Sequence, residues 1–202
     1  MDKPKVIFET ERLFIRSAEE TDKEPYMNLR VAVSEVSKAY QRVPKYRDYE
    51  WKQELYSDNN IFMAVFLKGT DDLAALCSFQ NYKSECIEFG FDVAERYRKQ
   101  GIATELVLGM LREAGTLFPC RKIKIRTNAS NAACRRVAEK CGAVLAGYEP
   151  DVLARALIQY MDMYGKEPTE DPKTLEKRRE YTEYIENNME GICVYEFAGA
   201  AD

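Results

Sequence analysis

The chain alternates between short hydrophobic runs and segments with helical periodicity, and it has no internal repeat. Residues 61–67 form an unbroken apolar run and residues 73–79 are mostly apolar, which predicts two strands. The segment between them, Lys68-Gly69-Thr70-Asp71-Asp72, has the glycine and aspartates of a tight turn. The two strands are therefore expected to form a hairpin.

A further strand is predicted at residues 86–93, where successive side chains would point to opposite faces of a sheet. One face would carry Ile87, Phe89, Phe91 and Val93, and the other Cys86, Glu88, Gly90 and Asp92. The second face therefore has a carboxylate in the middle of the strand, next to a glycine.

A helical pattern begins at Gly101, because apolar residues recur every four positions from Ile102 to Met110. Residues 122–127 alternate between apolar and charged side chains and predict another strand. A helix is expected at about residues 131–141, ended by Gly142 in the usual position after the last turn.

The remaining predicted elements complete a layered fold. They are strands at 13–16, 144–148 and 192–197, helices and loops within 19–56, and helices at 152–164 and 172–188. This order predicts an α/β (α+β) fold in which helices flank a mixed, mostly antiparallel central sheet. We expect residues 1–202 to form a single domain, with residues 149–190 as a helical insertion before the last strand.

The first helix of this insertion has an apolar stripe that must be covered. Its members recur at helical spacing: Leu153, Leu157, Tyr160, Met161 and Tyr164. The stripe could pack on the protein's own core, on a second subunit in a homodimer, or over the substrate as a lid. The charged helix that follows is typical of a solvated cover.

Composition limits the class of protein. With 46% hydrophobic and 32% charged residues, the chain resembles a soluble globular protein. A formal net charge of −4 gives no general attraction to nucleic acid or to anionic membranes. The longest apolar run is far shorter than the roughly 20 residues of a membrane helix. The first residues lack the apolar core of a secretory signal, so we expect a cytoplasmic protein with neither membrane nor nucleic acid as partner.

The chain has no histidine, which excludes nucleophile pairs that need His and every His-containing metal site. Its six cysteines include no C-x-x-C pair, so we expect no metal site and predict free, mostly buried thiols. There is also no G-x-G sequence and no P-loop, which argues against ordinary NAD and ATP sites. Any acid or base must be Glu, Asp, Tyr, Lys, Cys or water.

Positive charge is concentrated in residues 95–140, which carry 11 basic and four acidic side chains. Charge alone leaves two interpretations, a site for an anionic ligand and a solvated cationic face. The position of Arg96–Thr104 favours a ligand, because this segment joins the end of a predicted strand to the start of a helix. Such a turn directs unpaired backbone N–H groups at one point, where phosphate oxygens fit.

Four motifs together resemble the GNAT superfamily of N-acyltransferases. The segment Arg98-x-x-Gly101-x-Ala103 is similar to its acyl-CoA pyrophosphate loop. Thr10-Glu11-Arg12-Leu13-Phe14-Ile15-Arg16 resembles the opening strand of the branch that includes ribosomal-protein N-terminal acetyltransferases. Asn131-x-x-Cys134 and Glu139-Lys140-Cys141-Gly142 resemble the start and the end of the family's fourth helix.

The resemblance implies acetyl-CoA as co-substrate, bound where the strand at 86–93 splays from the strand at 122–127. The pantetheine arm would pair with the backbone of Phe91 and Val93, and Asn131 would reach the cofactor from the neighbouring helix. The pyrophosphate would lie on the loop formed by Arg98, Lys99, Gln100, Gly101, Ile102, Ala103 and Thr104.

The resemblance also implies a direct transfer to an amine, which needs a base and a donor to the oxyanion. Glu88 is the candidate base, acting through water, and a backbone N–H near Phe91 is the candidate donor. A surface salt bridge is the alternative role for Glu88. Many members use a helix tyrosine as general acid, where this chain has Ala138. Tyr148, Tyr160 and Tyr164 are the candidate replacements, of which Tyr148 is our choice, and a structural role is the alternative for each.

We therefore expect an N-acetyltransferase that acts on a primary amine, either a small molecule or a protein N-terminus. The acceptor would contact the segments 32–56 and 149–190. A non-catalytic acyl-CoA sensor or interaction module of the same fold is the first alternative. A nucleic-acid-binding domain built on residues 95–140 is the second.

Overall fold

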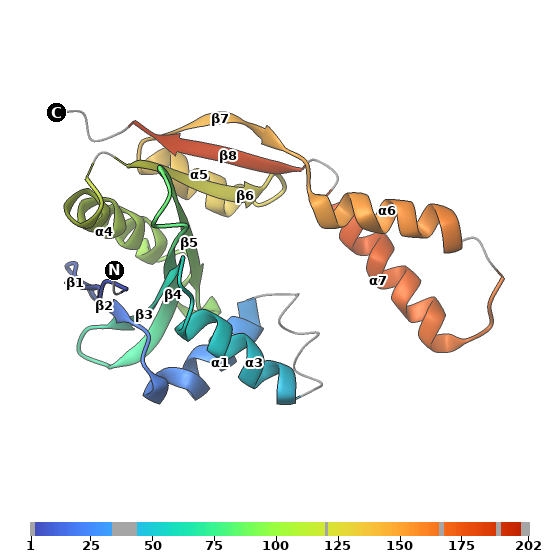
Figure 1. Ribbon diagram of the computed structural model, residues 1–202, viewed down its shortest axis with the longest axis horizontal. Helices are drawn as coiled ribbons and strands as arrows, with labels where there is room; N and C mark the ends of the chain where they lie inside the picture. The colour runs from blue at the N-terminus through green and yellow to red at the C-terminus, as the bar shows by residue number, and fades with distance from the viewer. Residues whose placement is uncertain (1–2, 34–43, 120, 166–167, 189–190, 199–202) are drawn as a thin grey trace.

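The structure is a computed structural model that describes residues 3–33, 44–119, 121–165, 168–188 and 191–198 (Figure 1). Its strands are β1 (Ile7–Glu9), β2 (Leu13–Ser17), β3 (Ile61–Leu67), β4 (Asp72–Gln80), β5 (Cys86–Val93), β6 (Lys122–Asn128), β7 (Ala143–Glu149) and β8 (Ile192–Phe197). Its helices are α1 (Lys23–Val33), α3 (Pro44–Leu55), α4 (Ile102–Leu117), α5 (Ala132–Lys140), α6 (Val152–Tyr164) and α7 (Pro172–Asn188).

The strands form one sheet in the order β1-β2-β3-β4-β5-β6-β8-β7. The pair β5–β6 is parallel and the other neighbours are antiparallel, which confirms the mixed, mostly antiparallel sheet. The prediction that the first strand begins at Leu13 was incomplete, because the three-residue strand β1 precedes it and pairs with β2. Three residues are too few to show a periodic pattern.

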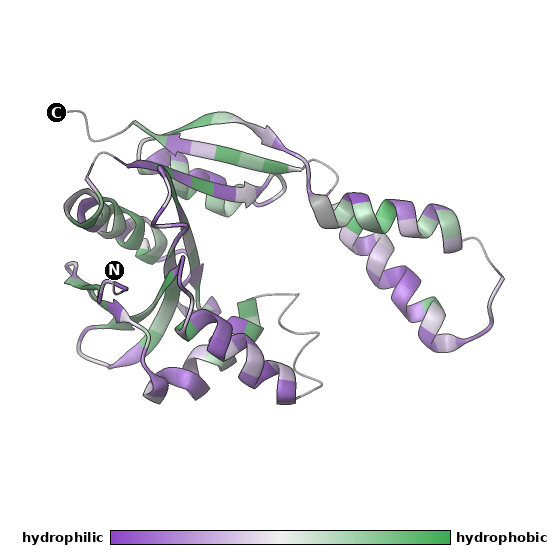
Figure 2. Cartoon of the chain, in the orientation of Figure 1, coloured by the Kyte–Doolittle hydropathy of each residue, from purple (hydrophilic) through white to green (hydrophobic). Residues whose placement is uncertain are grey.

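Helices cover both faces of the sheet, as the layered fold predicts. On one face, α4 and α5 close the larger core, in which Leu106 and Met110 of α4 pack with Ile87 and Phe89 of β5. On the other face, α1 and α3 close a smaller core around Trp51. Figure 2 shows the contrast between the largely hydrophobic α4 and the largely hydrophilic α7.

The sheet splays between β5 and β6. The two strands pair only from Cys86 to Glu88 on β5, opposite Lys122 to Lys124 on β6. Beyond Glu88, β5 continues to Val93 along β4, whereas β6 continues along β8. This confirms the predicted splay, and it leaves one edge of β5 open next to the start of α4.

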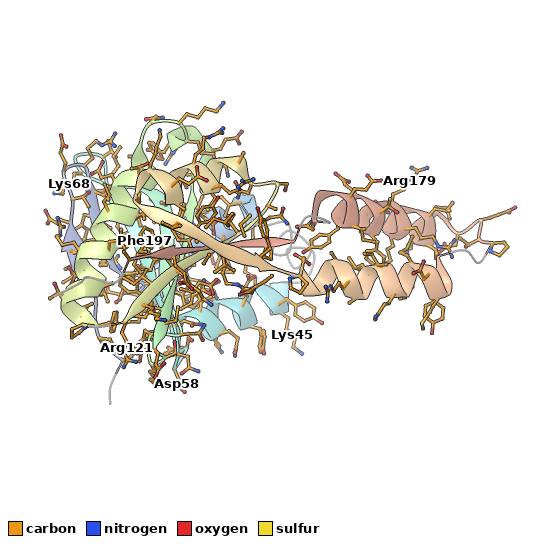
Figure 3. The ribbon with its side chains drawn as sticks, turned by 90° about the horizontal axis from the view of Figure 1, so that it is seen from above. Lys45, Asp58, Lys68, Arg121, Arg179 and Phe197 are labelled. Carbon is orange, nitrogen blue, oxygen red and sulfur yellow. The ribbon has the colours of Figure 1, made fainter. Side chains whose placement is uncertain are left out.

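Helices α6 and α7 lie side by side and extend beyond the end of the sheet (Figures 1 and 3). The Tyr160 ring contacts Tyr181 of α7 with a centroid distance of 5.7 Å. Leu157 and Met161 are half-buried, but Tyr160 and Tyr164 remain 47% and 46% exposed. The predicted apolar stripe is thus covered in part by α7. The side chain of Leu153 lies outside the described residues. Packing of the stripe on a second subunit, or over the substrate as a lid, stays a prediction.

None of the helices in the described parts of the chain is both long and apolar enough to span a membrane. The five described cysteines are free thiols, of which Cys77 and Cys193 are buried. The sixth, Cys120, lies outside the described residues.

Candidate active site

The segment between β5 and α4 contains two residues in the left-handed backbone region. They are Lys99, with φ of 60°, and Gly101, with φ of 81°. Glycine adopts this conformation without a steric penalty, whereas lysine does so at a cost of about 1–2 kcal/mol. A turn of this kind brings successive N–H groups into a concave, anion-binding arrangement.

The first turn of α4 adds further donors to this loop. Gly101 is the N-cap and has no side chain to bond the helix start; the first hydrogen bond of the helix joins Glu105 N to Gly101 O at 3.0 Å. Among the described residues, the N–H groups of Ile102, Ala103 and Thr104 have no acceptor. Together with the exposed side chains of Arg98 and Lys99, they form a site suited to a phosphate group.

The open edge of β5 presents backbone groups next to this loop. The N–H of Ala94 bonds Ala74 O on the β4 side at 2.9 Å. Because alternate residues of a strand direct their backbone groups to opposite edges, those of Phe91 and Val93 face the splay. Arg98 Nε donates to Val93 O at 3.0 Å, so the carbonyl of Val93 is engaged by the loop. The structure thus brings Phe91, Val93 and the loop together.

Asn131 lies across the splay, at the start of α5. Its side-chain oxygen caps the helix by accepting a hydrogen bond from Cys134 N at 3.1 Å. The other end of α5 reaches the first turn of α4, where Cys141 Sγ lies 3.7 Å from Thr104 O. At about 1.5 Å per residue, Asn131 is roughly 15 Å along the helix from that contact.

Glu88 lies where the splay begins, on the face of the sheet that α1 and α3 cover. Its side chain is 15% exposed, and no described residue forms a hydrogen bond with its carboxylate. Burial raises the pKa of Glu88, while Arg126 and then Lys124 oppose that rise. The carboxylate is therefore a more basic group than an ordinary glutamate, with its oxygens available to a substrate or a water.

Arg126 of β6 links Glu88 to Glu149 of β7, and no pattern in the sequence indicated this contact. Its Nη1 lies 3.8 Å from Glu88 Oε2, and its Nη2 lies 2.5 Å from Glu149 Oε2. The Arg126 guanidinium is therefore paired mainly with Glu149, the closer of the two carboxylates. Glu88 therefore takes part in an ion pair with Arg126, and its role as base stays a prediction.

A second charged group lies farther along the same face of β5. Arg30 of α1 contacts Asp92 Oδ2 through Nη1 and Glu54 Oε1 through Nε, both at 3.1 Å. Burial raises the pKa of Asp92 and of Glu54, and Arg30 opposes both shifts. Unlike Glu88, Asp92 is hydrogen-bonded to an arginine.

Gly90, between the two carboxylates, makes room for polar side chains of β4. A Cβ atom at this position would lie 2.6 Å from both Ser78 Oγ and Gln80 Nε2. These two side chains also bond each other at 3.1 Å. The glycine therefore allows polar groups to lie close to the backbone beside Glu88.

Tyr148 is not brought to the same face as Glu88. A bulge between Leu145 and Gly147 shifts the register of β7, so that Tyr148 pairs with the buried Cys193 on the α5 side. Its neighbour Glu149 then faces Arg126 and Glu88 on the other side. The side chain of Tyr148 is 63% exposed, and its role as general acid stays a prediction.

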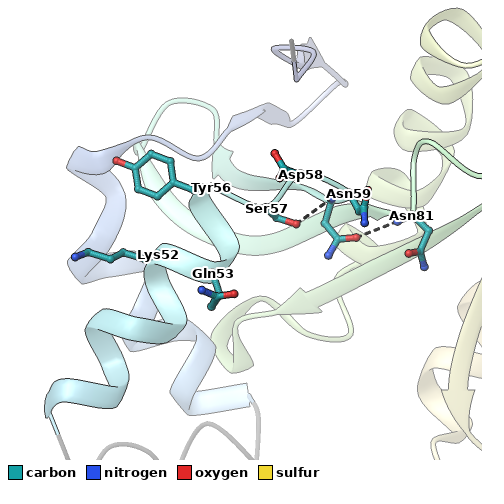
Figure 4. Close-up of a pocket in the computed structure, with 8 residues that line it drawn as sticks. Lys52, Gln53, Tyr56, Ser57, Asp58, Asn59 and Asn81 are labelled. Carbon is teal, nitrogen blue, oxygen red and sulfur yellow. Dashed lines mark hydrogen bonds between the residues drawn. The ribbon is translucent and has the colours of Figure 1, made fainter. Parts of the chain in front are cut away.

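A shallow polar pocket lies where the end of α3 meets the turn after β4 (Figure 4). It is lined by Lys52, Gln53, Tyr56, Asn81 and residues 57–60. The Asn81 N–H donates to Asn60 Oδ1 at 2.9 Å. The pocket includes part of the predicted acceptor segment 32–56, but neither Glu88 nor the loop of residues 98–104. Residues 34–43 of the acceptor segment lie outside the described residues.

Comparison with protein families gives one match over most of this region. Residues 12–144 match the family model described as acetyltransferase (GNAT) domain. This range contains the loop, the splay, Glu88 and Asn131, and it ends before α6 and α7. A search of curated proteins finds no match.

Solved structures with this fold are also found, at low sequence identity. A chimera of the spermidine N-acetyltransferase from Vibrio cholerae has a TM-score of 0.65 at 15% identity, over 93% of this chain and 95% of that one. An acetyltransferase (GNAT family) from Bacillus anthracis has a TM-score of 0.61 at 19% identity, over 95% and 98%. A ribosomal-protein alpha-N acetyltransferase in complex with coenzyme A has a TM-score of 0.65 at 13% identity, over 98% and 100%.

Proposed function

The chain belongs to the GNAT acetyltransferase family, and from this premise we propose that it transfers the acetyl group of acetyl-CoA directly to a primary amine. Acetyl-CoA supplies an activated thioester when bound. The acceptor would be a small molecule or a protein N-terminus. Cytoplasmic location and a homodimer belong to the same proposal.

One observation supports this proposal: the open edge of β5 lies between a loop suited to an anion and the carboxylate of Glu88, whose one described ion pair is the 3.8 Å contact with Arg126. On one side, the N–H groups at the start of α4 suit a pyrophosphate. On the other face, Glu88 has a raised pKa and no hydrogen bond from the described residues. An acyl group carried along the edge at Phe91 and Val93 would reach the splay, where the carboxylate can act on an incoming amine.

In this mechanism Glu88 removes a proton from the amine, directly or through a water, while the nitrogen attacks the thioester carbonyl. A backbone N–H near Phe91 stabilises the oxyanion that forms. The carbon–sulfur bond then breaks, and the thiolate leaves with a proton from a general acid. Asn131 and the loop from Arg98 to Thr104 hold the cofactor.

The acceptor would approach from the face that carries α1 and α3, because Glu88 projects there. Four carboxylates lie around the splay on this face, those of Glu88, Glu149, Asp92 and Glu54, and they are accompanied by three cations, Arg126, Arg30 and Lys124. This charge favours a cationic amine. Spermidine, the substrate named for one structural relative, and a peptide with a free N-terminus are the first acceptors to test.

Calorimetric titration tests the cofactor site first. Acetyl-CoA and CoA should bind the wild type with micromolar affinity and ATP should not, and Gly101→Trp should abolish binding by filling the loop. Absence of CoA binding to the wild type would contradict the proposal.

A screen of amines, with CoA release as the readout, then identifies the acceptor. Monoamines, spermidine and N-terminal peptides are compared at equal concentration. Turnover with any of them supports the transferase. Tight CoA binding without turnover on the whole panel would favour the non-catalytic sensor instead.

A further inference from the structure

The segment that joins β1 to β2 lies against the start of α4, although about 90 residues separate the two in sequence. Arg12 Nε contacts Glu105 Oε2 at 2.6 Å, and the Arg12 backbone N–H donates to Glu105 Oε1 at 2.8 Å. Thr10 Oγ1 donates to the same Oε1 at 2.5 Å. Three hydrogen bonds thus fix the Glu105 carboxylate in the first turn of the helix.

Arg12 also reaches the cofactor loop itself. Its Nη1 donates to Gln100 O at 3.0 Å. Gln100 lies between Lys99 and Gly101, the two residues with left-handed backbone. A Cβ atom added at Gly101 would lie 3.4 Å from Arg12 Nη2, so the guanidinium lies directly against the turn. The bond to Gln100 therefore holds the loop between its two left-handed residues.

The same contact changes the charge at the anion site. Glu105 is the acidic residue in the first turn of α4, where an unpaired carboxylate would repel a pyrophosphate. Burial acts to raise the pKa of Glu105, but the hydrogen bonds from Thr10 and Arg12 outweigh it and hold the pKa below its usual value. The ionised carboxylate is thus neutralised by Arg12 and turned toward the β1–β2 segment.

We propose that Arg12, paired with Glu105, is a positioning residue for the cofactor: it holds the loop in the shape that binds the pyrophosphate and cancels the nearby negative charge. This inference rests on the proposed function, because it assigns the loop to acetyl-CoA. It also gives a role to the motif Thr10-Glu11-Arg12-Leu13, which the proposed chemistry leaves unexplained.

Arg12→Met tests this role because it keeps the length of the side chain and removes its donors and charge. Loss of a hydrogen bond to a charged group predicts that CoA binds about 10- to 100-fold more weakly. Pantetheine, which lacks the pyrophosphate and would bind along β5, should lose little affinity. Calorimetry on both ligands therefore separates a local effect on the loop from general damage to the fold.

The double variant Arg12→Met/Glu105→Gln provides the sharper measurement. If Arg12 neutralises Glu105, removing that charge should restore part of the CoA affinity that Arg12→Met loses. A merely structural pair predicts no recovery. Lys68→Met is the matched control: Lys68 contacts Glu9 and the Thr10 carbonyl at 2.7 Å each and makes no described contact with the loop, so CoA affinity should not change.

Hydrogen exchange of the loop gives a readout that does not depend on the cofactor. Arg12→Met should speed amide exchange in residues 98–104 of the free protein, and Lys68→Met should not. Unchanged CoA affinity, equal losses for CoA and pantetheine, or unchanged loop exchange would each overturn the inference. If the wild type binds no CoA, the proposed function fails, and the exchange data still decide whether Arg12 holds the loop.

Discussion

Replacing Glu88 by glutamine tests the proposed base with a minimal change in shape. The amide fills the same space but cannot accept the proton of the amine. A positioned general base contributes about 10²- to 10⁴-fold to a rate. At about 1.36 kcal/mol per tenfold, that corresponds to about 2.7–5.4 kcal/mol of the barrier. We expect kcat to fall by this factor with little change in the KM for acetyl-CoA, since the loop lies on the other face.

The same substitution should not destabilise the protein. Burial raises the pKa of Glu88 in the folded protein. Ionised Glu88 therefore destabilises the fold at pH values above the pKa that Glu88 has in the unfolded chain. Glutamine carries no charge and removes that cost. Glu88→Gln should therefore melt at the same temperature as the wild type, or higher, at pH 7, and a loss of activity without a loss of Tm excludes misfolding.

The assay is the initial rate of CoA release with the best amine from the screen. Glu196→Gln is the control: Glu196 is an exposed carboxylate on β8, opposite Lys124 on the same face of the sheet, and its removal should leave the rate unchanged. Turnover by Glu88→Gln within about threefold of the wild type would refute the assignment of the base.

Three further predictions follow from the described contacts. Arg126→Met removes the main charge that lowers the pKa of Glu88, so the acid limb of the kcat/KM profile should move to higher pH. A shift to lower pH would show that the 3.8 Å contact with Arg126 does not lower the pKa of Glu88. Gly101→Val places a β-branched side chain at φ of 81° and should cost about 1–2 kcal/mol in a thermal melt as well as CoA affinity; an unchanged Tm would show that the turn relaxes. Leu106→Ala, at a fully buried position of α4, should lower the free energy of unfolding by about 2–5 kcal/mol in urea, and a smaller change would mean that the core collapses around the cavity.

The element bounds were predicted best where a hydrophobic pattern is long and ends at a turn. The strands at 61–67, 86–93 and 192–197 and the helices at 152–164 and 172–188 have the predicted bounds. Prediction failed for β1, where three residues give no periodicity. These outcomes reflect local side-chain periodicity, which a strand or helix of six or more residues displays in its own sequence.

The candidate site was predicted in part. A sequence pattern indicates each strand, helix and loop of the site, but it does not indicate contacts between residues that are distant in the sequence. The loop motif indicated an anion site, and the alternation of β5 put Glu88 and Asp92 on one face. No pattern indicated that Arg12 would reach Gln100 and Glu105, since that contact depends on how β1 and β2 lie against α4. Charge complementarity alone offers many such pairs in a chain with 64 charged residues.

The sequence by itself determined the order along the chain of the helices and of the strands from β2 to β8, the glycine that the loop needs at position 101, and the carboxylate in the middle of β5. Only the tertiary structure decided which of these groups meet. The bulge in β7 is the clearest case: one additional residue turns Tyr148 toward α5 and Glu149 toward Arg126. A shift of one residue exchanges the two faces of a strand, and it depends on pairing with β8 rather than on any local preference.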